Sequence, residues 1–169
     1  MAAQILSAGV VVLRWDADHY KYLLLKAYNY WDFPKGMVEQ AESPFACALR
    51  EVEEETTITQ LDFRWGKIYR QTQPYNHGRK VARYYIASTR VCDISLPINP
   101  TLGRPEHSAY RWVTRQQAWS MLTPRVQAIL RWSDDILAQR SQRSSRHAFS
   151  RSRAKYNSHQ ASLTKTEPG

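Results

Sequence analysis

Long apolar runs, cysteine-rich stretches and internal repeats are all missing from this sequence of 169 residues. No apolar run approaches the ~20 residues that a helix needs to cross a membrane, which argues against a membrane-spanning protein. The two cysteines, Cys47 and Cys92, give no zinc-ligand spacing and no disulfide framework, so we expect free thiols in a reducing cytoplasm. No basic residue precedes the short apolar run at the N-terminus, so we interpret this run as a strand and not as a signal peptide.

Positive charge is plentiful but unevenly distributed. The formal net charge is +9, and residues 139–169 contain seven Lys or Arg and one acidic residue, Glu167. This Ser/Arg-rich tail has no hydrophobic periodicity, and we predict that it is disordered. Its charge makes it a candidate for binding nucleic acid, and a solvated end without a partner is the simpler alternative. Residues 1–138 are long enough for one domain with a sizeable core, and we expect a cytoplasmic monomer.

The patterns outside the tail favour an α/β fold. Apolar and β-branched segments predict strands at Gln4–Leu13, Tyr20–Tyr28, Leu61–Gln73 (one or two strands), Lys80–Val91 and His107–Val113. A turn at residues 16–18 predicts that the first two strands form a hairpin. Loops are predicted at Asn29–Lys35, which is aromatic, and at Cys92–Arg104, which contains two prolines. A short helix after Thr114 and a longer one from Pro124 follow the last strand. Together these patterns indicate a mixed β-sheet between helices.

One predicted helix carries most of the acidic residues that matter to function. Ser43 suits the N-cap and Pro44 the first helical position. Glu51, Glu54 and Glu55 then share one face, because they are spaced i, i+3 and i+4, whereas Glu53 points away. Such a face is either a solvated surface or a site for a hard divalent cation such as Mg²⁺ or Mn²⁺.

The spacing around these carboxylates favours the cation. The segment Gly36–Ile58 resembles the Nudix box, G-x5-E-x7-R-E-U-x-E-E-x-G-U, in which U is a large apolar residue, and matches eight of its nine defined positions. The exception is Thr57, where the family has Gly; Thr fits a left-handed helix end poorly. The resemblance implies an α/β/α sandwich over about residues 3–138 and hydrolysis of a nucleoside diphosphate linked to another group.

The segments beside the box resemble one subgroup of that family. WDFPKGMVE at residues 31–39 and PEHSAYRWV at residues 105–113 are similar to segments of the asymmetrical diadenosine tetraphosphate hydrolases. Met37 and Gln40-Ala41 depart from the pattern of that subgroup.

The resemblance implies a role for each matching residue. Implied metal ligands are the Gly36 carbonyl, Glu51, Glu54, Glu55 and Glu106. Arg50 is implied to orient the acidic helix by pairing with a carboxylate such as Glu42, and Glu54 or Glu51 to act as the catalytic base. Substrate-binding roles are implied for Lys35 and Lys80 at the polyphosphate and for Tyr75 and Tyr110 against adenine.

The expected activity is Mg²⁺- or Mn²⁺-dependent attack of water on phosphorus, converting a dinucleoside tetraphosphate to ATP and AMP. Alternative substrates are the 5′-triphosphate end of RNA, a diphosphoinositol polyphosphate or another nucleoside-diphosphate derivative. A non-catalytic protein that binds nucleotide or RNA is the alternative from another class. The complete set of Arg50, Glu51, Glu54 and Glu55 favours an enzyme.

Overall fold

The computed structural model describes residues 4–139. The chain divides into two compact units, Met1–Ser133 and Asp134–Gly169. In the second unit, residues 134–139 are helical, and the predicted tail beyond them lies outside the described residues. No helix within residues 4–139 has the length and apolar character needed to cross a membrane.

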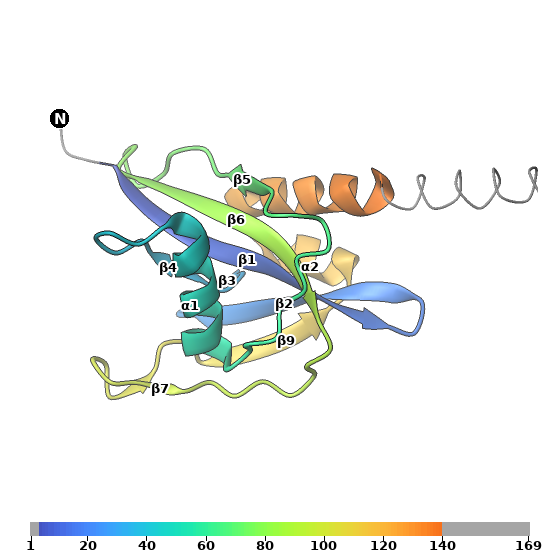
Figure 1. The fold of residues 1–169 in the computed structure, drawn as a ribbon, viewed down its shortest axis with the longest axis horizontal. Coiled ribbons are helices and arrows are strands. Elements are labelled where there is room, and N and C mark those ends of the chain that lie inside the picture. Colours follow the sequence, from blue (N-terminus) through green and yellow to red (C-terminus); the bar gives the residue numbers. More distant parts are fainter. Residues whose placement is uncertain (1–3, 140–169) are drawn as a thin grey trace, which may run out of the picture. The chain divides into compact units, whose positions relative to one another are not determined.

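The first unit is built on a mixed sheet (Figure 1). Its strands and labelled helices are β1 Ile5–Asp16, β2 His19–Ala27, β3 Tyr30–Asp32, β4 Lys35–Met37, α1 Pro44–Thr56, β5 Tyr69–Gln71, β6 Lys80–Thr89, β7 Ile98–Asn99, β8 Arg104–Pro105, β9 Ala109–Val113 and α2 Arg115–Met121. A further helix begins at residue 124.

The long strand β1 organises this sheet. The strand order is β3-β2-β1-β6-β5, with β4 also paired to β1 and β9 to β2. β1 runs parallel to β6 and antiparallel to β2 and β4, so the predicted mixed sheet and the predicted β1–β2 hairpin are confirmed. The pairing of β4 opposite Ser7–Gly9 brings Lys35–Met37 into the sheet.

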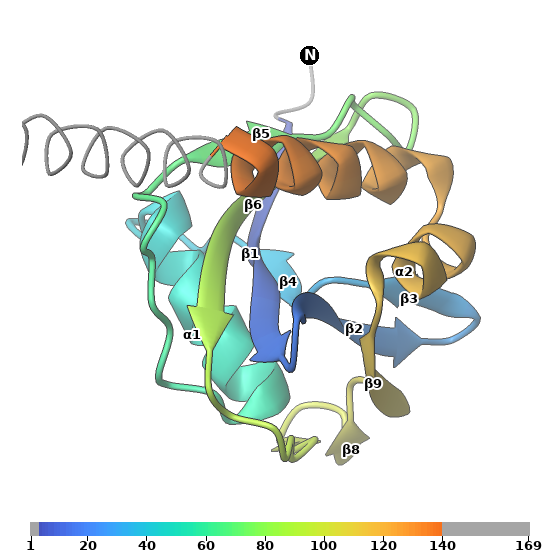
Figure 2. The same ribbon diagram turned by 90° about the vertical axis from the view of Figure 1, so that its right-hand side faces the viewer.

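Helices cover both faces of the sheet, as Figure 2 shows, with α1 on one side and α2 and residues 124–133 on the other. Apolar residues of β1 and β2 such as Val10, Val12 and Leu23 form a buried cluster with Ala48 and Val52 of α1. Burial of this apolar surface fixes α1 against the sheet, and the face that carries Glu51, Glu54 and Glu55 takes no part in this cluster. The predicted layered sandwich is therefore confirmed.

Three segments differ from the sequence prediction. Asn29–Lys35 is not simply a loop, because Tyr30–Asp32 forms β3 opposite β2 and Lys35 begins β4. Leu61–Gln73 contains only β5, together with an isolated bridge between Asp62 and Ser88. Cys92–Arg104 contributes two-residue strands, β7 and β8, that pair with each other. Of these strands only β4 pairs with a distant segment, β1, whereas β3, β7 and β8 pair with neighbours in the sequence. All are two or three residues long, which is too short to show the alternation that identifies a strand.

Both ends of α1 follow from identifiable residues. The Ser43 hydroxyl accepts a hydrogen bond from the backbone N–H of Ala46, and Pro44 lies in the first turn, as predicted. At the other end Thr57 adopts a left-handed conformation with φ of 64°, and its N–H donates to the Glu53 carbonyl. The helix therefore keeps the left-handed ending despite the β-branched side chain, which such a backbone disfavours.

We expect Thr57→Gly to raise the free energy of unfolding by about 0.5–1 kcal/mol, because Gly relieves the left-handed strain but has more freedom to lose on folding. Thr57→Ala is the control, since it removes the hydroxyl and keeps the Cβ atom. Chemical denaturation of the three proteins measures the difference. Equal stabilisation by Gly and Ala would show that the hydroxyl, and not the backbone, is responsible.

Candidate active site

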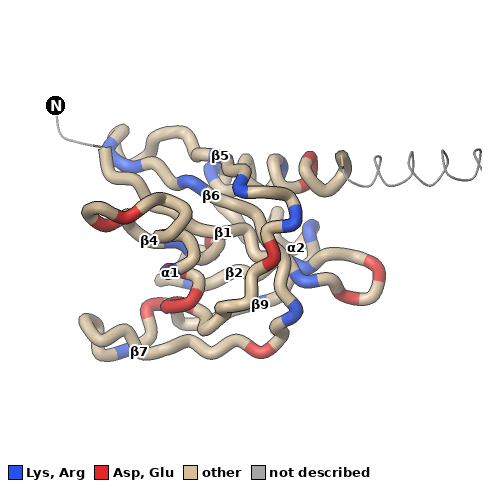
Figure 3. The backbone as a smooth tube through the Cα atoms, in the orientation of Figure 1, with Lys and Arg blue, Asp and Glu red and all other residues tan. Residues whose placement is uncertain are grey.

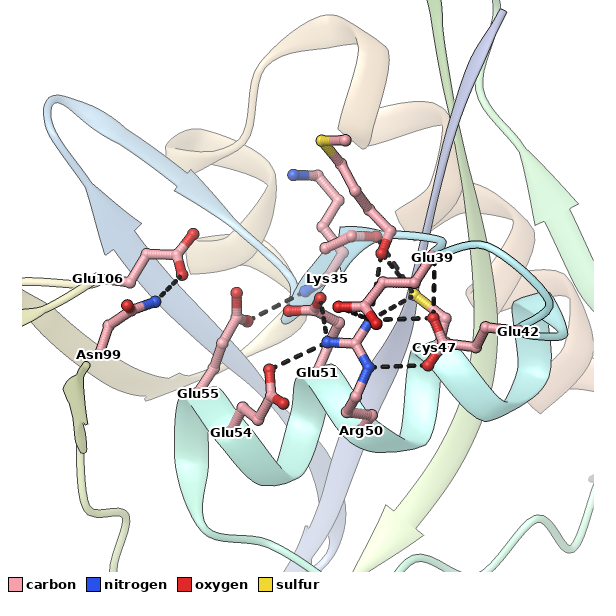
Figure 4. A network of polar contacts seen from close by, with 12 residues as sticks. Lys35, Glu39, Glu42, Cys47, Arg50, Glu51, Glu54, Glu55, Asn99 and Glu106 are labelled. Atoms are coloured by element: carbon pink, nitrogen blue, oxygen red, sulfur yellow. Dashed lines mark hydrogen bonds and ion pairs between the residues drawn. The ribbon is translucent and has the colours of Figure 1, made fainter. Parts of the chain in front are cut away.

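The acidic face of α1 opens onto a cavity of about 670 Å³. α1 contributes Arg50, Glu51, Glu54 and Glu55 to its wall, while β4 contributes Gly36. The opposite wall comes from the segment between β6 and β9 and includes Asn99, Glu106 and His107. Figure 4 shows the side chains of Glu51, Glu54 and Glu55 on one side of α1 and Glu106 across from them. Six residues singled out from the sequence thus share one cavity.

Arg50 joins the carboxylates of this cavity. Its Nε donates to Glu42 Oε1 at 2.7 Å, and its Nη1 donates to Glu51 Oε1 at 2.8 Å and to Glu54 Oε2 at 3.0 Å. Its Nη2 reaches Glu42 Oε2 and the Met37 carbonyl. Hydrogen bonding to this guanidinium lowers the pKa of Glu42 to about 2. Arg50 therefore ties α1 to the loop before it and holds Glu51 and Glu54 in place.

Glu55 is a buried carboxylate with no Lys or Arg side chain bonded to it within residues 4–139. Its side chain is buried, and Oε2 accepts a hydrogen bond of 3.1 Å from the backbone N–H of Lys35. Oε1 has no hydrogen-bond partner within the described residues, and the nearest ring nitrogen of His107 lies 3.9 Å away. Burial, followed by the charges of Glu51 and Glu106, raises the pKa of Glu55 well above its ordinary value. Burial also lowers the pKa of His107, so that this ring favours the neutral form.

Gly36 lies directly against Glu51. A Cβ atom added at Gly36 would come within 2.0–2.2 Å of the Glu51 carboxylate, so any side chain there would have to displace that carboxylate. In residues 4–139 no three His, Cys, Asp or Glu side chains are yet arranged as a ligand group for a metal ion. The carbonyl oxygen of Gly36 and the carboxylate oxygens of Glu51 and Glu55 are nevertheless the hard donors that Mg²⁺ prefers. A bound cation would supply the positive charge that the Glu55 carboxylate lacks.

A second cavity, of about 400 Å³, lies where β3 approaches the start of the helix at residue 124. Trp31, Asp32, Tyr75 and Arg125 line it, and the Arg125 guanidinium lies 4.0 Å from the centre of the Tyr75 ring. Lys35 Nζ lies 3.6 Å from Asp32 Oδ2. Burial alone would lower the pKa of Lys35, but the charges of Asp32, Tyr75 and Glu55 raise it above the ordinary value. Lys35 thus connects the two cavities, through its backbone to Glu55 and its side chain to Asp32.

Comparison with known proteins identifies this arrangement. The family model described as NUDIX domain matches residues 5–147. The chain belongs to the Nudix family. The asymmetrical bis(5'-nucleosyl)-tetraphosphatase of Sus scrofa is 32% identical over 108 residues, which cover 61% of this chain and 70% of that protein. The protein of the same description from Caenorhabditis elegans is 29% identical over 117 residues, covering 66% of this chain and 80% of that one.

The fold agrees with these relatives. A crystal structure of a C. elegans Ap4A hydrolase binary complex matches this Nudix domain with a TM-score of 0.70 and 27% identity, over 80% of this chain and 98% of that chain. The Nudix fold expected from the box and its flanks is therefore confirmed. Members of the family generally use divalent metal cations, which suits the hard oxygen donors around Gly36 and Glu55.

The four residues singled out for substrate binding, Lys35, Lys80, Tyr75 and Tyr110, do not line the acidic cavity of the Nudix domain. Tyr110, in β9 opposite Leu25, packs partly against the core beneath α1 and lines a different cavity from Tyr75. The two tyrosines thus line separate cavities in this structure. Lys80 begins β6, and its backbone exchanges hydrogen bonds with that of Tyr75.

Arg125 is a residue of this Nudix domain that sequence reasoning missed. It follows Pro124 in the first turn of a helix, and an Arg at that position is indistinguishable from a solvated surface residue. Only the folded chain brings it to the Tyr75 ring. Asn99 was missed for a similar reason, since its side chain reaches Glu106 at 3.4 Å from a segment with no recognisable motif.

The two thiols of the Nudix domain are expected to differ in reactivity. Cys47 is buried beside the Gly36 and Met37 carbonyls, and burial, helped by Glu42 and Glu51, raises the pKa of its thiol to about 12. Cys92 is exposed. Alkylation by iodoacetamide at about pH 8 should therefore modify Cys92 and spare Cys47 in the folded protein, because the thiolate is the nucleophile. Peptide mass spectrometry checks this, and equal labelling of both would contradict the burial of Cys47.

Proposed function

We propose that this Nudix domain hydrolyses dinucleoside polyphosphates with the help of a divalent cation, releasing ATP and AMP from the tetraphosphate. The observation that carries the proposal is the buried Glu55 carboxylate, whose Oε1 has no hydrogen-bond partner in the described part of the chain and which lies near Glu51 and Glu106. Burying like charges together is costly unless a cation joins them. The tetraphosphatase relatives support the substrate class.

The residues that would hold the cation are those with hard oxygen atoms at the cavity. They are the Gly36 carbonyl and the carboxylates of Glu51, Glu54, Glu55 and Glu106. A bound Mg²⁺ or Mn²⁺ neutralises phosphate charge and makes water a stronger acid.

We assign the proton-accepting role to Glu54, with Glu51 as the alternative. The Glu54 side chain is 58% exposed at the cavity, whereas Glu51 is 12% exposed and lies against Gly36. An exposed carboxylate can take a proton from water and return it to solvent, and Arg50 orients it through the 3.0 Å hydrogen bond to Oε2. The buried carboxylates are better suited to holding a cation.

The substrate would extend from the acidic cavity past Lys35 to the cavity lined by Tyr75. Lys35 offers positive charge to the polyphosphate between the two cavities, and Arg125 adds a second cation. Lys80, whose backbone pairs with that of Tyr75, is a further candidate. A nucleobase against Tyr75 would gain stacking energy with little discrimination between adenine and guanine.

A hydrolysis panel with identified products tests this proposal. Diadenosine tetraphosphate, diguanosine tetraphosphate, 5′-triphosphorylated RNA, ADP-ribose, NADH, a diphosphoinositol polyphosphate and dNTPs are compared with Mg²⁺, with Mn²⁺ and with chelator. We expect the fastest turnover for the dinucleotides, with ATP and AMP from the adenosine compound and none in chelator. Symmetric cleavage to two ADP, or faster turnover of another class, would overturn the substrate assignment.

Tyr75 and Tyr110 should respond differently to truncation. Tyr75→Ala should raise KM for diadenosine tetraphosphate by about 5- to 100-fold with a smaller fall in kcat, because it removes a stacking surface. Tyr110→Ala should instead lower the melting temperature, because it removes packing worth a few kcal/mol from the core. The Phe variant of each is the control and should be mild. A raised KM in a Tyr110→Ala protein of normal stability would restore Tyr110 to the nucleotide site.

A further inference from the structure

The segment between α1 and β6 carries a basic and aromatic surface that the proposed reaction does not use. Residues 64–70 read RWGKIYR and contain no acidic residue. Figure 3 shows Lys and Arg recurring along this part of the chain and at β5, whereas acidic residues gather on α1. β5 is the edge strand of its sheet, and its three residues are exposed. We call residues 64–71 the basic edge.

Cationic and aromatic side chains of the basic edge are stacked on one another or on neighbouring rings. Arg83 of β6 lies 4.1 Å from the centre of the Tyr69 ring and also donates two hydrogen bonds to Gln71. Lys67 Nζ lies 4.6 Å from the centre of the Phe45 ring. Tyr69 remains 48% exposed. These contacts hold flat and charged groups in place at the surface before any ligand binds.

One end of the basic edge leads into a cavity of about 690 Å³. Trp15, Tyr20, Arg64 and Arg90 contribute to its wall. Trp15 is 57% exposed, and its ring meets that of Tyr20 edge to face at 4.8 Å. Asp62 also lines the cavity and accepts two hydrogen bonds from Arg64, so Arg90 is the cation of the wall without a carboxylate partner within residues 4–139. A cavity of this size with an aromatic wall has room for a small flat group.

This surface is separate from the acidic cavity. Phe63 directly precedes the basic edge, and the centre of its ring lies 4.9 Å from the centre of the Phe45 ring of α1. The basic edge therefore packs beside α1. The carboxylates lie on a different face of the same helix, which is ~10 Å wide. A ligand on the basic edge would therefore not need to occupy the catalytic cavity.

We propose that the basic edge binds single-stranded nucleic acid, with Lys67 and Arg70 contacting phosphates, Tyr69 stacking on a base, and the Trp15 cavity accepting an unstacked base. The alternation of cations with exposed rings fits a strand whose bases are free, because phosphates need positive charge and bases need flat apolar surfaces. A duplex offers the phosphates but hides the base faces. This assignment is independent of the hydrolytic reaction.

Fluorescence anisotropy on the full chain tests the charge contribution. The probes are labelled oligouridine and oligothymidine of about 12 nucleotides and a duplex of equal length. The Lys67→Gln/Arg70→Gln double variant should bind the single strands at least about tenfold more weakly, with the slope of log K against log salt reduced by about 1.4. The matched control is Arg115→Gln/Arg131→Gln, which removes the same charge from two residues stacked on Trp119 and should change affinity by less than about twofold.

The stacking contribution is tested on the same preparations. Tyr69→Ala should weaken single-strand binding by about 5- to 100-fold and leave duplex binding unchanged, while Tyr69→Phe should retain both. Melting temperatures confirm that each variant is folded. Equal losses in the two double variants would mean that positive charge anywhere on the chain is sufficient, and this would overturn the proposal. So would equal affinity for duplex and single strand, or no binding by the natural sequence. Hydrolysis of diadenosine tetraphosphate, assayed in parallel, should be unchanged in all four variants.

Discussion

Replacing Glu55 or Glu54 by Gln should lower turnover by at least about 10²-fold at saturating Mg²⁺, because each change removes negative charge from the proposed cation and base positions. Steady-state rates with diadenosine tetraphosphate measure the effect. Glu53→Gln is the matched control, since Glu53 belongs to the same helix and also borders the cavity, whereas Arg50 holds Glu51 and Glu54. A Glu53→Gln protein as damaged as the others would show that loss of charge on the helix, and not the site, is responsible.

Glu55→Gln has a second expected effect that does not depend on activity. Since burial and nearby carboxylates raise the pKa of Glu55, its ionised form opposes folding at neutral pH when no cation is bound. Gln removes that charge, so the cation-free variant should melt at a higher temperature than the natural protein. Mg²⁺ should then raise the melting temperature of the natural protein more than that of the variant, because a ligand stabilises only the state that binds it. If the cation-free variant melted at a lower temperature than the natural protein, the interpretation that the Glu55 carboxylate is unpaired and destabilising would be wrong.

Gly36→Ala should reduce turnover by about 10²-fold or more while leaving the protein folded. The added methyl group would meet the Glu51 carboxylate at 2.0–2.2 Å, and that carboxylate is the far end of a flexible side chain that can swing away. Displacing Glu51 removes an oxygen from the site and breaks its bond to Arg50. A mispositioned group of this kind is enough to lose such a factor in rate.

Gly9→Ala provides the contrast. Here the added methyl group would lie 2.1 Å from the Pro34 carbonyl oxygen and 2.4 Å from the Lys35 Cβ atom, at the pairing of β1 with β4. Backbone atoms cannot move aside without separating the strands, so we expect loss of several kcal/mol of stability and poor folding. Melting temperature and turnover on both variants distinguish the cases. An unfolded Gly36→Ala protein would show that Gly36 is needed for the fold and not only for the site.

The features that sequence reasoning predicted are mostly local. The Ser43 cap, the course of α1 and the shared face of Glu51, Glu54 and Glu55 depend on residues within a few positions of one another, and helical geometry relates them directly. The β1–β2 hairpin could also be predicted, because its two strands are joined by a short turn.

What sequence reasoning missed depends on distant contacts. β4 exists because it pairs with Ser7–Gly9, and Arg125 matters because folding brings it to Tyr75. Strand register likewise assigns Tyr110 to a position opposite Leu25, beside the core, and on a cavity other than the one lined by Tyr75. Register and the packing of separate segments are set by the whole sheet, so spacing along the chain does not reveal them.

The parallel pairing of β1 with β6 also determines when the site can form during folding. It joins Ile5 to Lys80 and Arg14 to Thr89, so β1 has to wait for a strand that is synthesised much later. α1 and its carboxylates leave the ribosome before β6 does. Until β6 has been synthesised, α1 has no completed sheet to pack on. Non-local parallel pairing is slow because a long loop has to close before any contact offsets its entropy. Because α1 packs on β1, and β1 pairs with β6 along most of its length, unfolding of β6 would weaken the support of α1, and amide hydrogens of the two elements should exchange together.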